Sequence, residues 1–337
     1  MDALLFDLGG TFLRAGIMSD AGMVCETERI RIPSIADGHQ AEVIWPHVLG
    51  YIVNYASAHR EDVFSGAPLV ISFPGPVSAS GRVLQAPTVA GDSMQVFDLA
   101  AAAAQKTGRR VFLLNDISAA AWRLAETRPE RRFLVVTVSS GIGSKIFDRC
   151  HASGVLDQPA YAGEIGHIVV DDRRSAPVCD CGGRGHLGAV ASGRAIERHA
   201  RARAARYPNA FRRSKAALEF GATADTLNNE QHFVPAVRAG DAWATQVVLR
   251  CTRPLARTLL TVAMAAGLER VFVIGGFAQA LGSCYIKILR HLSCEYSRYD
   301  VVHERLGSMF ELASEDCEMC LEGCAAFLRS RRSGPWS

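Results

Sequence analysis

The sequence predicts an α/β protein built from two lobes, and three observations support this prediction. Apolar segments that read as strands alternate with segments of helical spacing. Several of the strands end in glycine turns, where main-chain N–H groups can approach a ligand closely. The chain has 337 residues, and single hydrophobic cores stop growing near about 250–300 residues.

Composition and charge exclude several classes of protein. Hydrophobic residues make up 49% of the chain, which excludes wholesale disorder, and the formal net charge of +3 is too small to indicate nucleic acid as a partner. No apolar run is long enough to span a membrane, and the start "MDALLFDLGG" lacks the features of a signal peptide. We therefore expect a cytoplasmic protein, in which the 10 cysteines are thiols or metal ligands rather than disulfides.

The first third of the chain reads as strands followed by helices. A buried strand ends in glycines, a β-meander follows, and Gly108 is a typical helix stop. Strands are expected at 3–10, within 13–33 and at 67–77, and helices at 41–59 and 96–108.

The remainder repeats this order. Strands are expected at 109–116, on both sides of a turn within 131–147, and at 270–276, with helices at 117–126, across 194–260 and at 315–332. Cys317, Cys320 and Cys324 have the spacing of one buried helical stripe. We expect a small α/β lobe at 1–117, joined by the returning helix 316–332, and a large lobe at 118–315.

Glycine turns follow three apolar strands, at 6–11, 139–144 and 274–279. Each could hold a phosphate group through main-chain N–H groups, although a glycine also ends many strands for structural reasons alone. None fits the P-loop pattern. Asp7 precedes the first turn, and a carboxylate beside phosphate needs a cation between them, such as Mg²⁺. The alternative is that Asp7 only caps a turn.

The segment 163–193 concentrates cysteine, histidine and glycine. His167, Cys179, Cys181 and His186 offer two imidazoles and two thiolates, a set that suits tetrahedral Zn²⁺, and the glycines among them allow a tight knuckle. A redox pair is the weaker interpretation, because Cys-x-Cys is too close for an unstrained disulfide. The sequence therefore predicts a structural zinc site.

Five segments together resemble the ROK family of sugar kinases: "DLGGT", "LLNDISAAA", "SSGIGS", "GEIGH" and "CDCGGRGHLGAVASG". The likeness runs from about residue 2 to residue 330. It implies a two-lobed actin-like ATPase (ribonuclease H-like) fold with a cleft between the lobes. It also implies ATP-dependent phosphorylation of a primary hydroxyl of a sugar-like polyol, and lobes that close around their substrate.

The resemblance also implies roles for single residues. Asp116, which alone could equally be read as a helix cap, becomes the base that accepts the proton of the attacking hydroxyl. Glu164 and His167 face the sugar, and zinc on one nitrogen of His167 leaves the other nitrogen for a hydroxyl. The "SFPGPV" loop lines the sugar pocket, although a plain turn explains its prolines equally well. The substrate-binding set is Pro74, Gly75, Asn115, Asp116, Glu164 and His167, and the ATP-binding set is Asp7, Gly9, Gly10, Thr11, Ser140, Gly141, Gly143, Gly275 and Gly276.

Two positions depart from the family pattern. The usual cysteine at position 186 is histidine, which makes a zinc site with two histidines and two cysteines an inference. The glutamate common at position 188 of glucose-type kinases is glycine, which removes an acceptor near the anomeric end. A C7-cyclitol of the valiolone type fits this change, and a hexose or N-acylhexosamine with water in the vacated space is the alternative.

Other functions remain less compatible with the sequence. A sugar-responsive regulator of this family would carry a helix-turn-helix before "DLGGT", which begins at Asp7. A non-catalytic binding protein would not need Asp116 and three glycine turns. The family analogy suggests a homodimer.

Overall fold

The structure is a computed structural model that describes residues 2–78, 81–91, 97–159, 161–313 and 318–333. It divides into two units. Unit 1 contains Met1–Pro129, Phe147–Ala162 and Asp316–Ser337, and unit 2 contains Glu130–Ile146 and Gly163–Glu315. This division differs from the predicted boundary at residue 117, because 118–129 and 147–162 pack with unit 1. Within the described residues, no helix is both long and apolar enough to cross a membrane.

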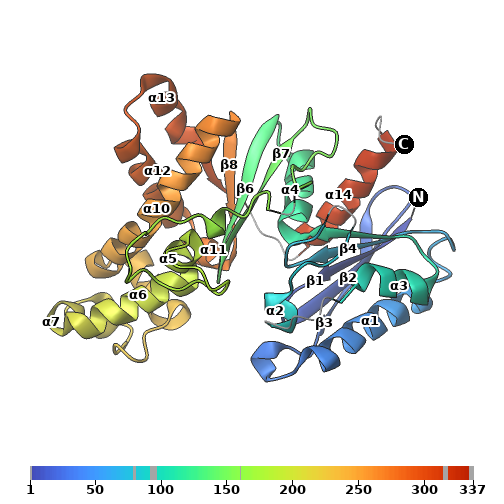
Figure 1. Ribbon diagram of the computed structural model, residues 1–337, viewed down its shortest axis with the longest axis horizontal. Helices are drawn as coiled ribbons and strands as arrows, with labels where there is room; N and C mark the ends of the chain where they lie inside the picture. The colour runs from blue at the N-terminus through green and yellow to red at the C-terminus, as the bar shows by residue number, and fades with distance from the viewer. Residues whose placement is uncertain (1, 79–80, 92–96, 160, 314–317, 334–337) are drawn as a thin grey trace. The chain divides into compact units, whose positions relative to one another are not determined.

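Unit 1 is built on a five-stranded sheet of order β3-β2-β1-β4-β5. The first three strands form the predicted antiparallel meander, and β4 and β5 run parallel to β1 (Figure 1). The strands are β1 (Ala3–Leu8), β2 (Phe12–Met18), β3 (Val24–Arg31), β4 (Leu69–Phe73) and β5 (Val111–Asn115).

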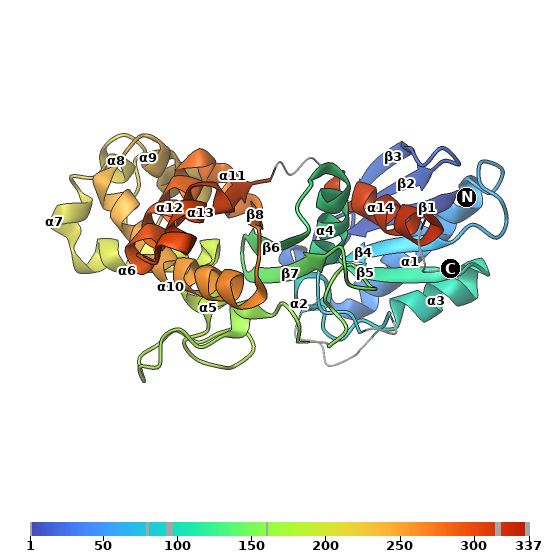
Figure 2. The same ribbon diagram turned by 90° about the horizontal axis from the view of Figure 1, so that it is seen from above.

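Two helices cover each face of this sheet (Figures 1 and 2). Along β1, Leu4, Phe6 and Leu8 pack in the cluster with the helices of one face, whereas Ala3 and Leu5 pack with those of the other. This alternation explains why β1 reads as a continuous apolar run. The first face carries α1 (Ala41–Ala58) and α3 (Leu99–Thr107), and the second carries α4 (Asp116–Thr127) and α14 (Met319–Ser333).

Most helices of unit 1 agree with the sequence prediction. Gly108 ends α3 with φ of 67°, as predicted from the helix-stop pattern. Helix α14 packs against α4 and the sheet of the same unit, and Cys320 and Cys324 lie in it. Cys317, the other member of the expected stripe, lies outside the described residues. The short elements of this unit are η1 (Ile35–Asp37) and α2 (Pro87–Ala90).

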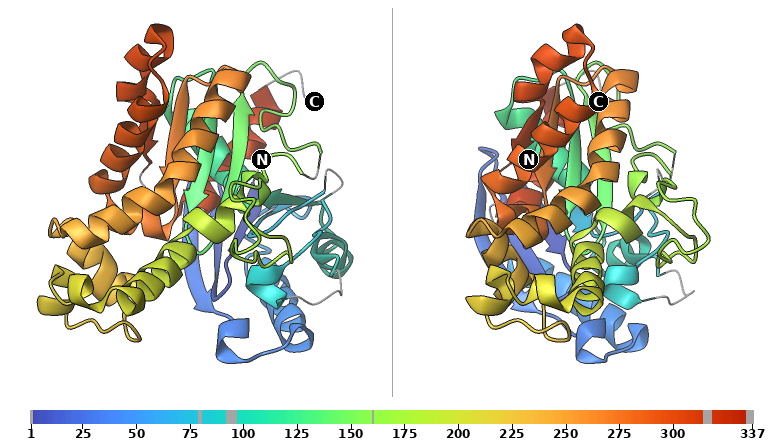
Figure 3. Two further views of the ribbon diagram at one scale, coloured as in Figure 1. Left: turned by 60° about the vertical axis from the view of Figure 1, so that its left-hand side comes forward. Right: turned by 90° about the vertical axis from the view of Figure 1, so that its left-hand side faces the viewer.

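Unit 2 is built on a four-stranded sheet of order β7-β6-β8-β9, in which β6, β8 and β9 are parallel. Helices α10 and α12 pack on one another and on this sheet (Figure 3). The strands are β6 (Arg132–Val138), β7 (Ile142–Asp148), β8 (Arg270–Ile274) and β9 (Phe310–Leu312). The helices are η2 (Ile165–His167), α5 (Leu187–Ala191), α6 (Gly193–Arg206), α7 (Pro208–Phe211), α8 (Lys215–Leu218), η3 (Asn229–Phe233), α9 (Val234–Arg238), α10 (Ala242–Ala266), α11 (Gly276–Leu281), α12 (Ser283–Tyr296) and α13 (Asp300–Met309).

Candidate functional site

The first glycine turn joins β1 to β2 as a tight hairpin. The Gly9 N–H donates to the carbonyl oxygen of Phe12 at 2.8 Å, which closes the turn that holds Gly10 and Thr11. Asp7 and Arg14 are paired across the hairpin, and the Arg14 guanidinium donates to Asp7 Oδ2 at 2.8 Å. The Asp7 carboxylate is nearly buried, where an unpaired negative charge would be costly. The Arg14 guanidinium balances that charge.

This ion pair changes how Asp7 could contact Mg²⁺. The sequence predicts a cation between Asp7 and a phosphate, and Arg14 already supplies a positive charge beside Asp7. The Oδ1 atom of Asp7 can still accept from a water of a hydrated Mg²⁺, which is the way this ion commonly meets carboxylates. The residues therefore fit a water-mediated magnesium contact better than direct coordination.

The ends of β4 and β5 are joined by a side chain. Asn115 Nδ2 donates to the Gly75 carbonyl oxygen at 2.9 Å, and Asn115 Oδ1 accepts from the N–H groups of Ile117 and Ser118. Asn115 is thus the N-cap of α4, and one Nδ2 hydrogen remains for a further partner. A Cβ atom at Gly75 would lie 2.6 Å from the Gln85 carbonyl oxygen, so this turn after Pro74 requires glycine.

Asp116 is the first residue of α4 and is partly exposed. Its Oδ1 atom accepts from the Ile117 N–H at 2.8 Å, and its main-chain oxygen lies 3.8 Å from the Cys320 thiol. Burial, followed by the charges of Asp7 and Asp116, raises the pKa of Cys320, so this cysteine stays a thiol that can donate. Asn115 is the N-cap residue of α4, so the contact of Asp116 with the Ile117 N–H adds to a cap that another side chain already supplies.

The other two glycine turns lie together in unit 2. Parallel pairing of β6 and β8 puts the turn that holds Ser140, Gly141 and Gly143 at the same sheet edge as the turn at Gly275 and Gly276. Gly275 has φ of 101°, and a Cβ atom there would lie 2.6 Å from the Val138 main-chain nitrogen. The close approach of the two strand ends therefore requires glycine, and Ser140 and Gly141 in the neighbouring turn are exposed residues.

The Cys/His segment folds as a knuckle. Cys179 N–H donates to the Gly183 carbonyl oxygen at 2.7 Å, and Gly182 N–H donates to the Cys179 carbonyl oxygen at 2.8 Å. A Cβ atom at Gly183 would lie 2.3 Å from the His186 ring, so the ring occupies the space that a side chain would need. The turn thereby brings the two cysteines toward the two histidines.

The four predicted metal ligands meet. One ligand atom from each of His167, Cys179, Cys181 and His186 lies within 4.8 Å of the others. Cys181 Sγ is 3.2 Å from His186 Nδ1, and Cys179 Sγ is 3.9 Å from His167 Nδ1. Bond lengths of zinc to nitrogen and sulfur give ligand separations of about 3.3–3.8 Å in a tetrahedron, so the two measured separations lie just outside this range and the donor set is compatible with Zn²⁺. With Nδ1 facing the thiol, Nε2 is the ring nitrogen of His167 left for another partner.

Glu164 lies at the start of η2, three residues before His167. Its Oε1 atom is 3.9 Å from the buried Lys145 Nζ. Helix α5 packs closely beside η2. A Cβ atom at Gly188 would be only 3.3 Å from the Gly166 carbonyl oxygen. Glycine at position 188 therefore allows a close approach of two main chains as well as removing an acidic side chain.

Three residues that contact the predicted site residues were not themselves predicted as site residues from the sequence: Arg14, Lys145 and Cys320. Arg14 could have been found, since it follows the hairpin at the position that pairs with Asp7. Lys145 carries a weaker signal, a charged residue between Ser144 and Ile146 in a strand that is only partly buried. Cys320 gives no signal of its proximity to Asp116, because 204 residues separate the two in the chain.

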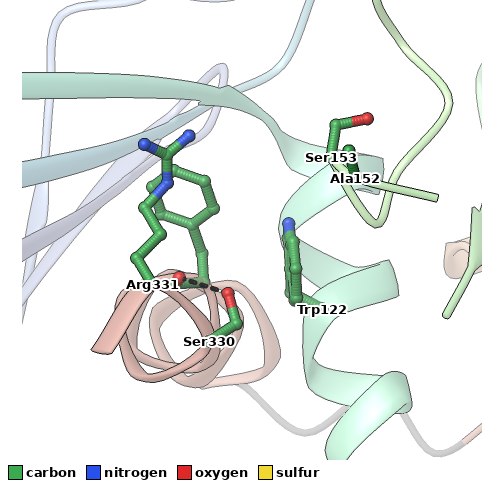
Figure 4. A pocket seen from close by; sticks show the side chains of 6 residues that line it. Trp122, Ala152, Ser153, Ser330 and Arg331 are labelled. Carbon is green, nitrogen blue, oxygen red and sulfur yellow. Dashed lines mark hydrogen bonds between the residues drawn. The ribbon is translucent and has the colours of Figure 1, made fainter. Parts of the chain in front are cut away.

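A separate hollow of about 130 Å³ lies in unit 1 beside α4 and α14 (Figure 4). It contains none of the predicted site residues. Trp122 follows Asp116 by six residues, so it lies about 9 Å further along the helix. The lining residues are Trp122, Ala152, Ser153, Phe327, Ser330 and Arg331.

Comparisons with known proteins agree with the predicted family. The chain is 36% identical to the C(7)-cyclitol 7-kinase of Streptomyces hygroscopicus subsp. jinggangensis, over 99% of this chain and 95% of that protein. It is 26% identical to the glucokinase of Thermotoga maritima, over 97% of both chains. The ROK hexokinase structure from Thermus thermophilus superimposes with a TM-score of 0.70 at 25% identity, covering 97% of both chains.

These likenesses confirm the predicted α/β fold of the actin-like ATPase type. The model of the ROK family matches residues 4–313, which is most of the chain. The chain therefore belongs to the ROK family.

Proposed function

We propose that this protein is an ATP-dependent kinase that phosphorylates the primary hydroxyl of a C7-cyclitol of the valiolone type. One observation carries the assignment of the reaction: Asp116 is a partly exposed carboxylate at the end of β5, on a helix already capped by Asn115. Phosphoryl transfer needs such a carboxylate to accept the proton of the attacking hydroxyl.

In this mechanism Asp116 takes the hydroxyl proton while the hydroxyl oxygen bonds to the γ-phosphorus of ATP and ADP leaves. The glycine turns at Gly9–Thr11, Ser140–Gly143 and Gly275–Gly276 offer main-chain N–H groups to the nucleotide. Mg²⁺ supplies neutralisation of phosphate charge when bound, and Asp7 would accept from its water.

Two side chains and one similar protein support a C7-cyclitol as the acceptor of the phosphoryl group. Glu164 accepts hydrogen bonds from hydroxyls, and His167 Nε2 is available for another. The cysteine and histidine cluster would hold Zn²⁺ as a structural ion that orients His167. The relative at 36% identity is named for a C7-cyclitol, and Gly188 is compatible with a ligand that lacks an ordinary anomeric hydroxyl.

An ADP-release assay with ATP and three acceptors tests the proposal: valiolone, D-glucose and N-acetyl-D-mannosamine. We expect valiolone to give the highest kcat/KM, and ³¹P NMR of the product to show a phosphomonoester on the exocyclic CH₂ group. Faster turnover of D-glucose would instead assign a hexokinase, and ADP release with none of the three would overturn the kinase assignment.

A further inference from the structure

Lys145 places a buried positive charge beside a side chain of the proposed acceptor site. It belongs to β7 and is 5% exposed, whereas the Glu164 side chain is 34% exposed. Their Nζ and Oε1 atoms are 3.9 Å apart. Because burial of an ammonium group is costly, an apolar residue would have served the strand core better. The placement brings a positive charge to within 3.9 Å of the side chain that the proposed function turns toward the acceptor.

The main chain holds this pair in position. The Gly163 carbonyl oxygen accepts from Ser144 N–H at 3.0 Å and from Ser144 Oγ at 2.9 Å. Gly163 has φ of 84°, and a Cβ atom there would lie 3.1 Å from Lys145 Cδ. The lysine stem thus packs on the main chain that precedes Glu164, which limits where the Lys145 ammonium group can lie relative to that residue.

The separation of the two charged atoms fits one bridging oxygen. At 3.9 Å, Nζ and Oε1 are beyond a direct hydrogen bond, but an oxygen can lie about 2.8 Å from both. An ammonium group only donates and a carboxylate only accepts. The bridging group must therefore accept from Lys145 and donate to Glu164. A water molecule does both, and so does a substrate hydroxyl that takes its place.

We propose that Lys145 is a specificity-determining residue, and that Lys145 and Glu164 together bind one hydroxyl of the polyol acceptor. This inference rests on the proposed function, because that function turns Glu164 toward the acceptor. The pair selects a hydroxyl over an ammonium substituent at the same carbon, because an ammonium group cannot accept from Lys145 and is repelled by it. The substrate class is thus a polyol that carries a free hydroxyl, not an amino group, at this position.

The test is the kinetics of Lys145→Met with valiolone, or with D-glucose if that is the better acceptor. We expect KM for the acceptor to rise about 10–100-fold, because Glu164 loses its partner and the hydroxyl loses a donor. KM for ATP should stay within about twofold. Lys215→Met is the matched control, since Lys215 is a half-exposed lysine whose Nζ lies 3.6 Å from Glu219, and it should change neither constant.

A double-mutant cycle separates this role from a structural one. Glu164→Gln alone should also raise acceptor KM, but in the Lys145→Met background its effect should be at least about fivefold smaller. Additive effects, or an acceptor KM within about twofold of wild type in folded Lys145→Met, would overturn the inference. If Lys145→Met does not fold by circular dichroism, Lys145→Arg replaces it and should retain more acceptor affinity than Glu164→Gln.

Calorimetric titration with valiolone and D-glucose separates this inference from the proposed function. Wild-type protein that binds a polyol but releases no ADP overturns the kinase assignment, while the affinities of the variants still decide the role of Lys145. Wild-type protein that binds neither polyol overturns both.

Discussion

The Asn115 side chain joins the ends of two neighbouring strands by donating a hydrogen bond of 2.9 Å to the Gly75 carbonyl oxygen. The same side chain caps α4 through its oxygen. The loop at Gly75 and the start of α4, which the resemblance both assigned to the acceptor, are therefore linked by a single amide. Asp116 follows directly, so its direction is set by this arrangement before any ligand binds.

Asp116→Asn should abolish most turnover and keep binding. Loss of a general base typically costs about 10²–10⁴-fold in rate, whereas an amide of the same shape still contacts the acceptor. Measurement of kcat by ADP release and of acceptor affinity by calorimetry checks this. The exposed Asp225→Asn is the control, and a kcat of Asp116→Asn within about tenfold of wild type would remove Asp116 from its role.

Cys181→Ser should lose the metal. Protein purified without chelator is expected to contain about one zinc per chain, because four donor atoms converge in the knuckle. Serine is a poor zinc ligand, so inductively coupled plasma mass spectrometry should show much less zinc in this variant. The exposed Cys150→Ser should keep it. Wild-type protein with no zinc contradicts the assignment.

Gly183→Ala should weaken zinc binding without removing a ligand. The added methyl group would lie 2.3 Å from His186 Cε1, so the ring must turn from its place. Competition with a chelator should show at least about tenfold weaker affinity, comparable to the loss of a group that orients a ligand. Gly50→Ala, where a Cβ atom meets nothing within 4 Å, should leave zinc affinity unchanged, and equal affinities in both variants would refute the argument.

Gly323→Ala should destabilise unit 1. A Cβ atom at Gly323 would lie 2.0 Å from the Ala119 carbonyl oxygen, so α14 could no longer approach α4 as closely. Overpacking of this kind costs about 1–3 kcal/mol, which urea denaturation would detect as a lower midpoint. Gly307→Ala has no atom within 4 Å of its Cβ and should not lower the midpoint. Equal midpoints for both variants would show that the two helices adjust freely.

Stability should fall as pH falls below 6.5, in part through His199. Burial, then Arg250 and Arg203, lower the pKa of His199 from its usual 6.5. As pH falls below 6.5, the unfolded chain takes up a proton that the folded chain resists, so the free energy of unfolding decreases. One histidine contributes at most about 1.4 kcal/mol per pH unit. His199→Gln should show a shallower decrease between pH 6.5 and 5 than wild type, and identical slopes would exclude this cause.

Local sequence patterns predicted the strands, most helices and the convergence of the two cysteines and two histidines. The apolar run of β1 and the stop signal at Gly108 depend on residues close in the chain, so they can be read without a structure. The knuckle ligands span only His167 to His186, and the intervening glycines limit how they can fold.

The remaining features depend on contacts between distant segments. Residues 147–162 comprise the end of β7 and the segment after it, yet they pack with unit 1, and no composition change marks that switch. The Lys145–Glu164 pair and the Cys320–Asp116 contact arise only when separate elements meet. From the sequence, glycine at position 188 was interpreted as leaving space in the acceptor site. The structure shows that it also lets α5 approach Gly166 closely, which the sequence alone does not reveal.

The docking of α14 on α4 has a consequence for biosynthesis. Residues 163–315, which belong to the other unit, are translated between these two helices. While the ribosome is still making them, one face of the first sheet lacks half of its helical cover, and apolar residues such as Leu5 and Val70 stay accessible to water and to chaperones. The N-terminal sheet therefore cannot mature first, and its completion must wait for the segment translated after the whole second unit.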